Sequence, residues 1–134
     1  MKTGALIFIL LALVAVFYER RQLFKRMRRF YDRRCTGRAW LKQFPSAQKA
    51  EIREFLEVFV VAFALDAKKR LSFAPDDKII DVYRTLYPEG WRADALEHVE
   101  WIQACKQRYR VDLSTYFHDD TTLGDLFRVV QNRV

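Results

Sequence analysis

The chain has 134 residues, a hydrophobic fraction of 51% and a net charge of +7. This length accommodates one compact unit of roughly 90 residues beside an anchor, and it excludes two ordinary domains. The two cysteines lack the spacing of a disulfide framework or a zinc site.

The first segment is an apolar block without any charge, over residues 4–18. As a helix at ~1.5 Å per residue it rises about 22 Å, so it spans a bilayer with help from the polar residues at its two ends. The alternative is a cleaved secretory signal, which would carry more positive charge before the block and a small-residue cleavage site after it. The sequence therefore predicts a transmembrane anchor over residues 1–18, with residues 4–18 in the lipid bilayer.

The positive charge is concentrated directly after this block. Residues 19–43 carry ten Lys or Arg against two acids, a net of +8, whereas residues 44–134 have a net of −2. A basic cluster beside a span follows the positive-inside rule, and its position argues against a nucleic-acid partner. We expect a single-pass protein of the bacterial inner membrane, with its N-terminus outside and its C-terminal domain in the cytoplasm.

Residues 19–45 are expected to form a basic juxtamembrane helix and a linker. Apolar residues recur there at helical intervals (Leu23, Phe24, Met27, Phe30 and Tyr31). This pattern predicts an amphipathic helix on the anionic inner surface, or else a solvated stalk. The residues expected to meet lipid headgroups are Arg20, Arg21, Lys25, Arg26, Arg28 and Arg29. Residues 35–45 are expected to be the linker.

Residues 46–134 show only helical periodicity, which predicts an all-α domain. The first helix is expected from about Ala47 to Lys69, capped by Ser46, with this inward face: Ile52, Phe55, Leu56, Phe59, Val60 and Phe63. A short helix follows, over Ile79 to Leu86.

Asp94 and Glu97 form a predicted capping box for a third helix, whose inward residues are Leu96, Val99, Ile102, Cys105 and Tyr109. Thr122 and Asp125 cap the last helix, whose buried stripe is Leu123, Leu126, Phe127 and Val130.

The segment Asp94-Ala95-Leu96-Glu97-His98-Val99-Glu100 is similar to the helix that carries the modified serine in acyl carrier proteins. With the connector at Val111 and Leu113 and the helix start at Thr122, residues 47–132 resemble the acyl carrier fold, in particular bacterial carrier-like proteins without that serine. The resemblance implies a small helical bundle. Ala95 occupies the serine position and has no hydroxyl, so it implies no phosphopantetheine attachment and no cofactor.

Candidate catalytic residues are few. His98 and Cys105 lie seven residues apart on one predicted helix and could be a base and a nucleophile, but a small buried apolar cysteine is the simpler interpretation. The run from His118 to Asp120 could hold a metal, but it is also ordinary composition for a helix start. Trp91 and Trp101 are expected to pack inside, with a partner anchor as the alternative. The sequence predicts no enzyme and no metal site.

Two functional hypotheses remain. In the first, the domain is a non-catalytic interaction module for a protein partner, which the resemblance connects with lipid or acyl metabolism. In the second, the chain is a small structural subunit of a membrane protein complex. Acids on the carrier helix meet basic patches of partner enzymes in carrier proteins, so Asp94, Glu97 and Glu100 are the candidate partner-binding residues. Their alternative role is capping and solvation.

Overall fold

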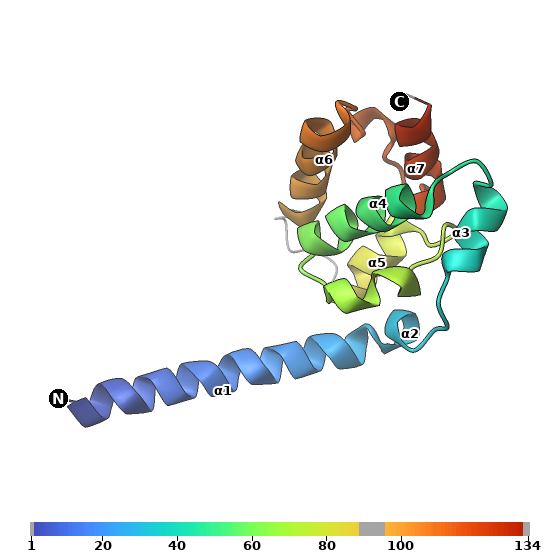
Figure 1. Ribbon diagram of the computed structural model, residues 1–134. Coiled ribbons are helices and arrows are strands. Elements are labelled where there is room, and N and C mark those ends of the chain that lie inside the picture. Colours follow the sequence, from blue (N-terminus) through green and yellow to red (C-terminus); the bar gives the residue numbers. More distant parts are fainter. Residues whose placement is uncertain (1, 89–95, 133–134) are drawn as a thin grey trace.

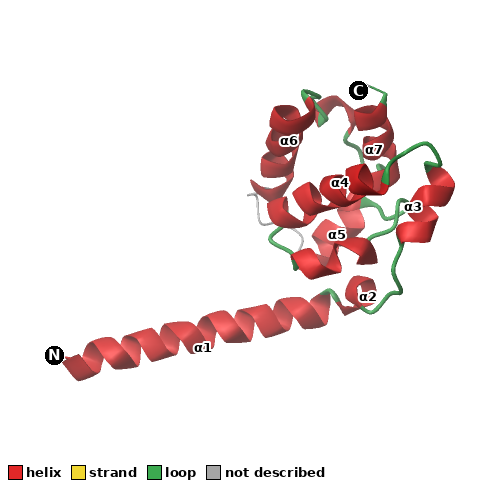
Figure 2. Cartoon of the chain, in the orientation of Figure 1, coloured by secondary structure: helices red, strands yellow, loops and turns green. Residues whose placement is uncertain are grey.

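The computed structural model describes residues 2–88 and 96–132 (Figure 1). These residues form α-helices and two short 3-10 helices, and none of them belongs to a strand (Figure 2). The all-helical prediction is confirmed.

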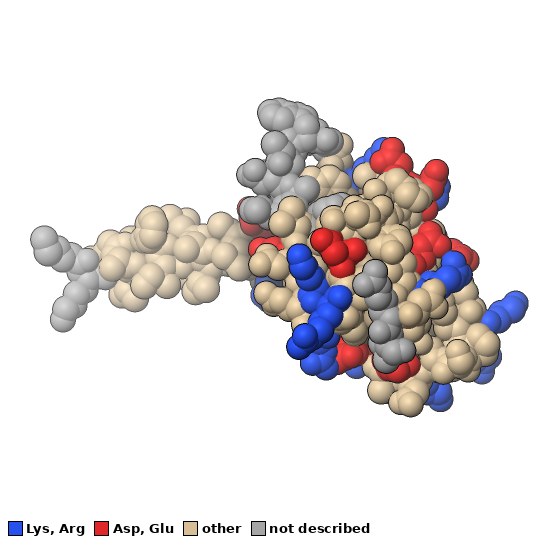
Figure 3. Space-filling view, turned by 90° about the horizontal axis from the view of Figure 1, so that it is seen from above, with Lys and Arg blue, Asp and Glu red and all other residues tan. Residues whose placement is uncertain are grey.

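The first helix, α1 (Lys2–Arg26), extends away from the rest of the molecule (Figure 1). Its large apolar side chains are exposed, and Leu6 to Tyr18 carry no charge, so that its projecting surface is tan in Figure 3. At about 1.5 Å per residue, a helix of 25 residues is about 37 Å long and exceeds a bilayer core of about 30 Å. Among the described residues, α1 is the one helix that is long and apolar enough to cross a membrane. A signal sequence would have the same length and composition.

The end of α1 packs into the domain. Met27, which separates α1 from α2 (Arg28–Tyr31), is fully buried, and Phe30 and Tyr31 are also buried. Phe24 is half-exposed and its ring lies 4.9 Å from that of Tyr31. The protein itself therefore buries Met27, Phe30 and Tyr31 on the apolar face of the basic segment, so this segment is not a solvated stalk, and contact of its cations with lipid headgroups stays a prediction.

The expected linker over residues 35–45 contains helix α3 (Gly37–Gln43). Trp40 is fully buried, and its indole Nε1 donates a hydrogen bond to the carbonyl oxygen of Phe73 at 2.8 Å. The hydroxyl of Thr36 donates to the same oxygen, also at 2.8 Å. The linker prediction was wrong, because the buried Trp40 and the hydrogen bonds to the carbonyl of Phe73 hold α3 against the core. The packed domain begins near Met27, before the expected boundary at residue 46.

Helix α4 (Lys49–Ala62) has Gln48, and not Ser46, at its N-cap. The backbone N–H of Gln48 donates to the Glu51 carboxylate at 3.0 Å. All six residues of its predicted inward face are buried. The helix ends seven residues before Lys69, because Ala64 has a φ of 53° and Leu65 N–H bonds the carbonyl of Val60 at 2.8 Å. This is a Schellman termination with alanine at the position that favours glycine.

The chain continues after α4 through η1 (Ala67–Ser72) and α5 (Ile79–Leu86). Between them, the carboxylate of Asp77 accepts two hydrogen bonds from Arg33 at 2.8 Å and one from Ala74 N–H at 2.7 Å. The short helix expected over Ile79 to Leu86 is α5, and its residues Ile79, Val82 and Leu86 are buried.

Helix α6 (Leu96–Tyr109) has Trp101 and Cys105 fully buried. Val99 is 57% exposed, so its predicted inward position was wrong. At 100° per residue Val99 lies about 200° from Trp101, and the larger indole occupies the core. The expected capping box cannot be compared, because Asp94 lies outside the described residues.

The chain closes with η2 (Ser114–Tyr116) and α7 (Leu123–Gln131). The predicted cap is confirmed: Thr122 Oγ1 accepts from Asp125 N–H, and Thr122 N–H donates to the Asp125 carboxylate, both at 3.1 Å. The expected stripe of α7 is buried. Gly124 allows close packing, since a Cβ there would lie 2.9 Å from the carbonyl oxygen of Pro75.

Ala64→Gly should stabilise the domain. Left-handed backbone costs alanine about 1–2 kcal/mol, and the greater freedom of glycine in the unfolded chain offsets about 0.4–1 kcal/mol of that gain. We expect a higher thermal midpoint in detergent, corresponding to about 0.5–1 kcal/mol. Ala50→Gly, on the exposed side of the same helix and without positive φ, should not raise the midpoint. Equal midpoints for Ala64→Gly and the parent chain would contradict the assigned strain.

Candidate functional site

A shallow groove of about 360 Å³ lies between α4 and α6. Its lining is Glu57, Val58, Val61, Ala62, Glu100 and Ala104. Val61 is 67% exposed, and α6 also exposes Val99. Large aliphatic side chains on two adjacent helices thus remain in contact with solvent, as is common where another protein binds.

The groove exists because both helices turn their aromatic residues away from it. Phe55 and Phe59 of α4 pack around Trp101, with ring centroids 6.0 and 4.9 Å from the indole. This contact fixes the rotation of α6 and brings its preceding residue, Glu100, to the groove. The small side chain of Ala104 keeps the space between the helices open.

The rim of the groove is acidic. Among residues 2–88 and 96–132, neither Glu57 nor Glu100 forms an ion pair. Glu54, one turn before Glu57, is paired with Arg108 of α6. The arrangement offers an apolar floor and two uncompensated carboxylates, which suits an apolar side chain flanked by Lys or Arg.

The predicted partner-binding residues are only partly placed. Glu100 lies in the groove. Glu97 belongs to α6, but its side chain and all of Asp94 and Ala95 are outside the described part of the chain. Sequence reasoning missed Glu57, because it lies 43 positions from Glu100 and no local spacing connects two helices that meet only in the fold.

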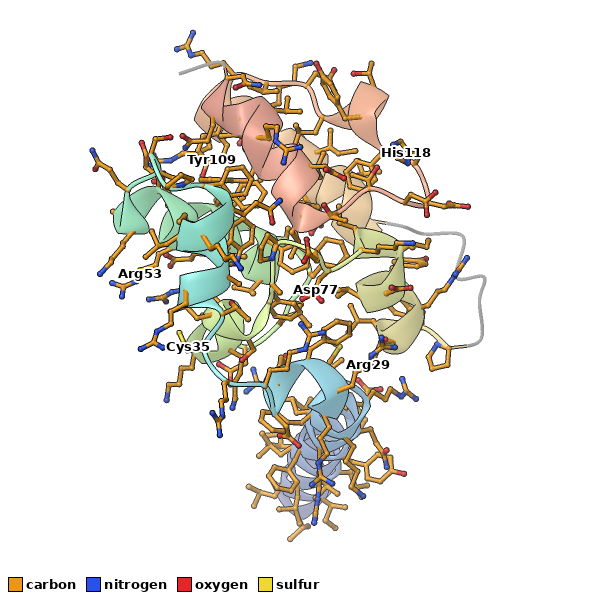
Figure 4. The ribbon with its side chains drawn as sticks, turned by 90° about the vertical axis from the view of Figure 1, so that its right-hand side faces the viewer. Arg29, Cys35, Arg53, Asp77, Tyr109 and His118 are labelled. Atoms are coloured by element: carbon orange, nitrogen blue, oxygen red, sulfur yellow. The ribbon has the colours of Figure 1, made fainter. Side chains whose placement is uncertain are left out.

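The predicted membrane-surface residues lie at the end of α1 and in α2. Arg20, Arg21 and Lys25 are exposed on α1. The other three also make contacts within the protein: Arg26 donates to the carbonyl oxygen of Leu86 at 3.5 Å, Arg28 lies 3.6 Å from Asp32, and Arg29 lies over the ring of Phe30. Figure 4 shows Arg29 where α1 meets the domain.

Of the candidate catalytic pair, the side chain of His98 lies outside the described part of the chain, whereas Cys105 is fully buried. Burial raises the pKa of the Cys105 thiol to about 12, so it stays protonated and unreactive at neutral pH. The Nδ1 atom of the exposed His118 accepts from Asp120 N–H at 3.3 Å. In the described part of the chain, no three His, Cys, Asp or Glu side chains are grouped as metal ligands.

The two cysteines should therefore react very differently. At pH 7.5 a maleimide should label the exposed Cys35 and leave Cys105 unlabelled, with both labelled in denaturant. Intact mass before and after denaturation measures this, and Cys35→Ser should remove the native-state label. Rapid labelling of Cys105 in the folded protein would contradict its burial.

Comparison with protein-family models finds no match for the chain. No curated protein and no solved structure is significantly similar to it.

Proposed function

We propose that the chain is a membrane-anchored, non-catalytic protein-interaction module, with α1 as its anchor and the α4–α6 groove as its binding surface. The observation that carries the proposal is the groove itself, where the exposed Val61 lies beside Glu57 and Glu100, two carboxylates without an ion pair among the described residues. Such a surface binds a basic partner by apolar burial, and the rim charges increase the association rate and the specificity.

The order of the helices supports an acyl-carrier-like bundle for the second half of the chain. A long α4, a connection with the short α5, the acidic α6, the turn η2 and the capped α7 follow in the order that the resemblance implies. With alanine at position 95, the proposed module keeps the docking helix of a carrier but binds no phosphopantetheine. Its partner would then be a basic surface on a protein of lipid or acyl metabolism.

The anchoring role is supported by the packing at the end of α1. Helix α1 runs without a break from the apolar block to residues that contact α5, and it leads directly into the buried Met27, so an anchor in this helix would hold the domain close to the bilayer. The apolar side chains of residues 6–18 would be costly to leave in water, at roughly 25 cal/mol per Å². We therefore place α1 in the bacterial inner membrane, with the basic residues and the domain in the cytoplasm.

The alternative proposal is a structural subunit of a membrane complex. It is supported by α1, whose apolar window has no buried residue in the described structure and is free to pack against other membrane helices. In that case the span alone would carry the association, and the groove would remain empty.

Topology is the first test. A phosphatase that is active only in the periplasm should be inactive when fused after Val134, whereas a cytoplasmic fluorescent reporter should be active there. The uncleaved chain should remain with membranes after an alkaline carbonate wash. Periplasmic activity of the fusion, or loss of residues 1–18 from the purified chain, would contradict the assignment.

Partner binding is the second test. A photo-crosslinking residue at Val61 should capture a protein in native membranes, and Glu57→Lys with Glu100→Lys should abolish that crosslink at low salt while leaving thermal stability nearly unchanged. Asp119→Lys, a reversal in the exposed loop beside His118, is the matched control. A crosslink that survives the double reversal would favour the structural subunit.

A further inference from the structure

A second basic cluster lies beside the basic end of α1, although the two are more than 40 positions apart in the sequence. It is the run Lys68-Lys69-Arg70 in η1. The ammonium of Lys69 lies 6.0 Å from the centre of the Phe24 ring and 3.5 Å from the carbonyl oxygen of Tyr31. Lys68 is exposed, and Lys69 and Arg70 are half-buried.

Several hydrogen bonds hold η1 in this position. The carboxylate of Asp66 caps η1 by accepting from Lys68 N–H at 3.0 Å, and Asp66 N–H donates to the hydroxyl of Tyr31 at 3.3 Å. On the other side, Thr36 N–H donates to the carbonyl of Leu71 at 2.8 Å. The cluster therefore has a fixed place relative to α1 and α2.

The charges of this cluster are not neutralised within the described residues. No ion pair there includes Lys68, Lys69 or Arg70, whereas Arg33 and Arg108 each have a carboxylate partner. Asp66 is the acid nearest to them in the sequence, and its carboxylate accepts a hydrogen bond from the backbone of η1. One acid beside three cations leaves a local excess of positive charge.

The distance to the membrane is short. Phe24 lies six residues after Tyr18, the last residue of the apolar block, which is about 9 Å along the helix axis at ~1.5 Å per residue. Because the Lys69 ammonium lies beside the Phe24 ring, it is at a similar distance from the apolar block. This is close to the Debye length of about 8–10 Å at ordinary ionic strength. A negative leaflet surface therefore attracts these side chains as well as those of α1.

We propose that η1 and the end of α1 form one membrane-binding face, composed of Arg20, Arg21, Lys25, Lys68, Lys69 and Arg70, which binds anionic lipid headgroups and sets the tilt of the domain on the bilayer. The proposal rests on the anchoring role of α1. It adds a lipid class and a second contact far from the span in sequence, so the domain is held at two places instead of one.

The full-length chain in lipid nanodiscs tests this proposal. Cys35 precedes the Thr36 that bonds η1, and it is exposed while Cys105 is buried, so a maleimide fluorophore on Cys35 reports on the position of η1. Nanodiscs of phosphatidylcholine, with or without one quarter phosphatidylglycerol, contain a lipid with a nitroxide headgroup as quencher. We expect stronger quenching in the anionic discs, and a loss of the difference in high salt.

Lys68→Gln with Lys69→Gln should reduce the quenching in anionic discs to the level in neutral discs, since each lysine near such a surface changes the ratio of bound to free orientations about fivefold. The matched control is Lys49→Gln with Arg53→Gln, two exposed cations of α4, which should quench like the parent chain. Equal quenching in both lipids, or an equal effect of the control pair, would overturn the membrane-binding face while α1 remains an anchor. Failure of the parent chain to enter discs would instead overturn the anchoring role and this inference with it.

Discussion

One chain of aromatic contacts connects the anchor to the groove. Phe30 of α2 stacks on Phe73 at 5.6 Å, Phe73 meets Phe59 of α4 at 5.3 Å, and Phe59 meets Trp101 of α6 at 4.9 Å. All four side chains are buried. The carbonyl oxygen of Phe73 also accepts the bonds that fasten α3. Removal of any of these rings would leave a cavity between the elements that they join, so these four rings set where α1 leaves the domain and how α6 is rotated.

The charges of the molecule are separated along the same line. Positive side chains gather where α1 meets the domain, and the unpaired acids Glu57 and Glu100 lie on the α4–α6 groove. In Figure 1, α6 lies on the side of the domain toward which α1 extends. With α1 in a membrane, as proposed above, a partner in the groove would lie near that membrane. A basic partner of the acidic groove would be repelled by the positive side chains where α1 meets the domain.

The core of the domain begins earlier in the chain than residue 47, where the region resembling acyl carrier proteins was expected to start. The core includes α3 and the end of α1, so the bundle is extended by elements that precede the expected carrier region. Trp40 packs at the centre of this addition, with ring contacts to Phe44, Phe55 and Phe127. A module with this extension is fixed to its anchor, whereas a carrier that delivers a substrate needs freedom to move between enzymes. This difference is consistent with the alanine at position 95.

The sequence by itself determined what depends on neighbouring residues. The apolar block predicts α1, the stripe from Ile52 to Phe63 predicts the buried face of α4, and Thr122 with Asp125 predicts the start of α7, because periodicity and capping act within a few turns. Only the tertiary structure decided which of several apolar side chains is buried in the core. Met27 and Phe30 had an apolar stripe equally suited to lipid or to protein, and Trp101 displaced Val99 from the core because the indole buries more surface. Contacts between distant segments bring Glu57 and Glu100 to one groove and place η1 beside α1. No local sequence pattern encodes such contacts.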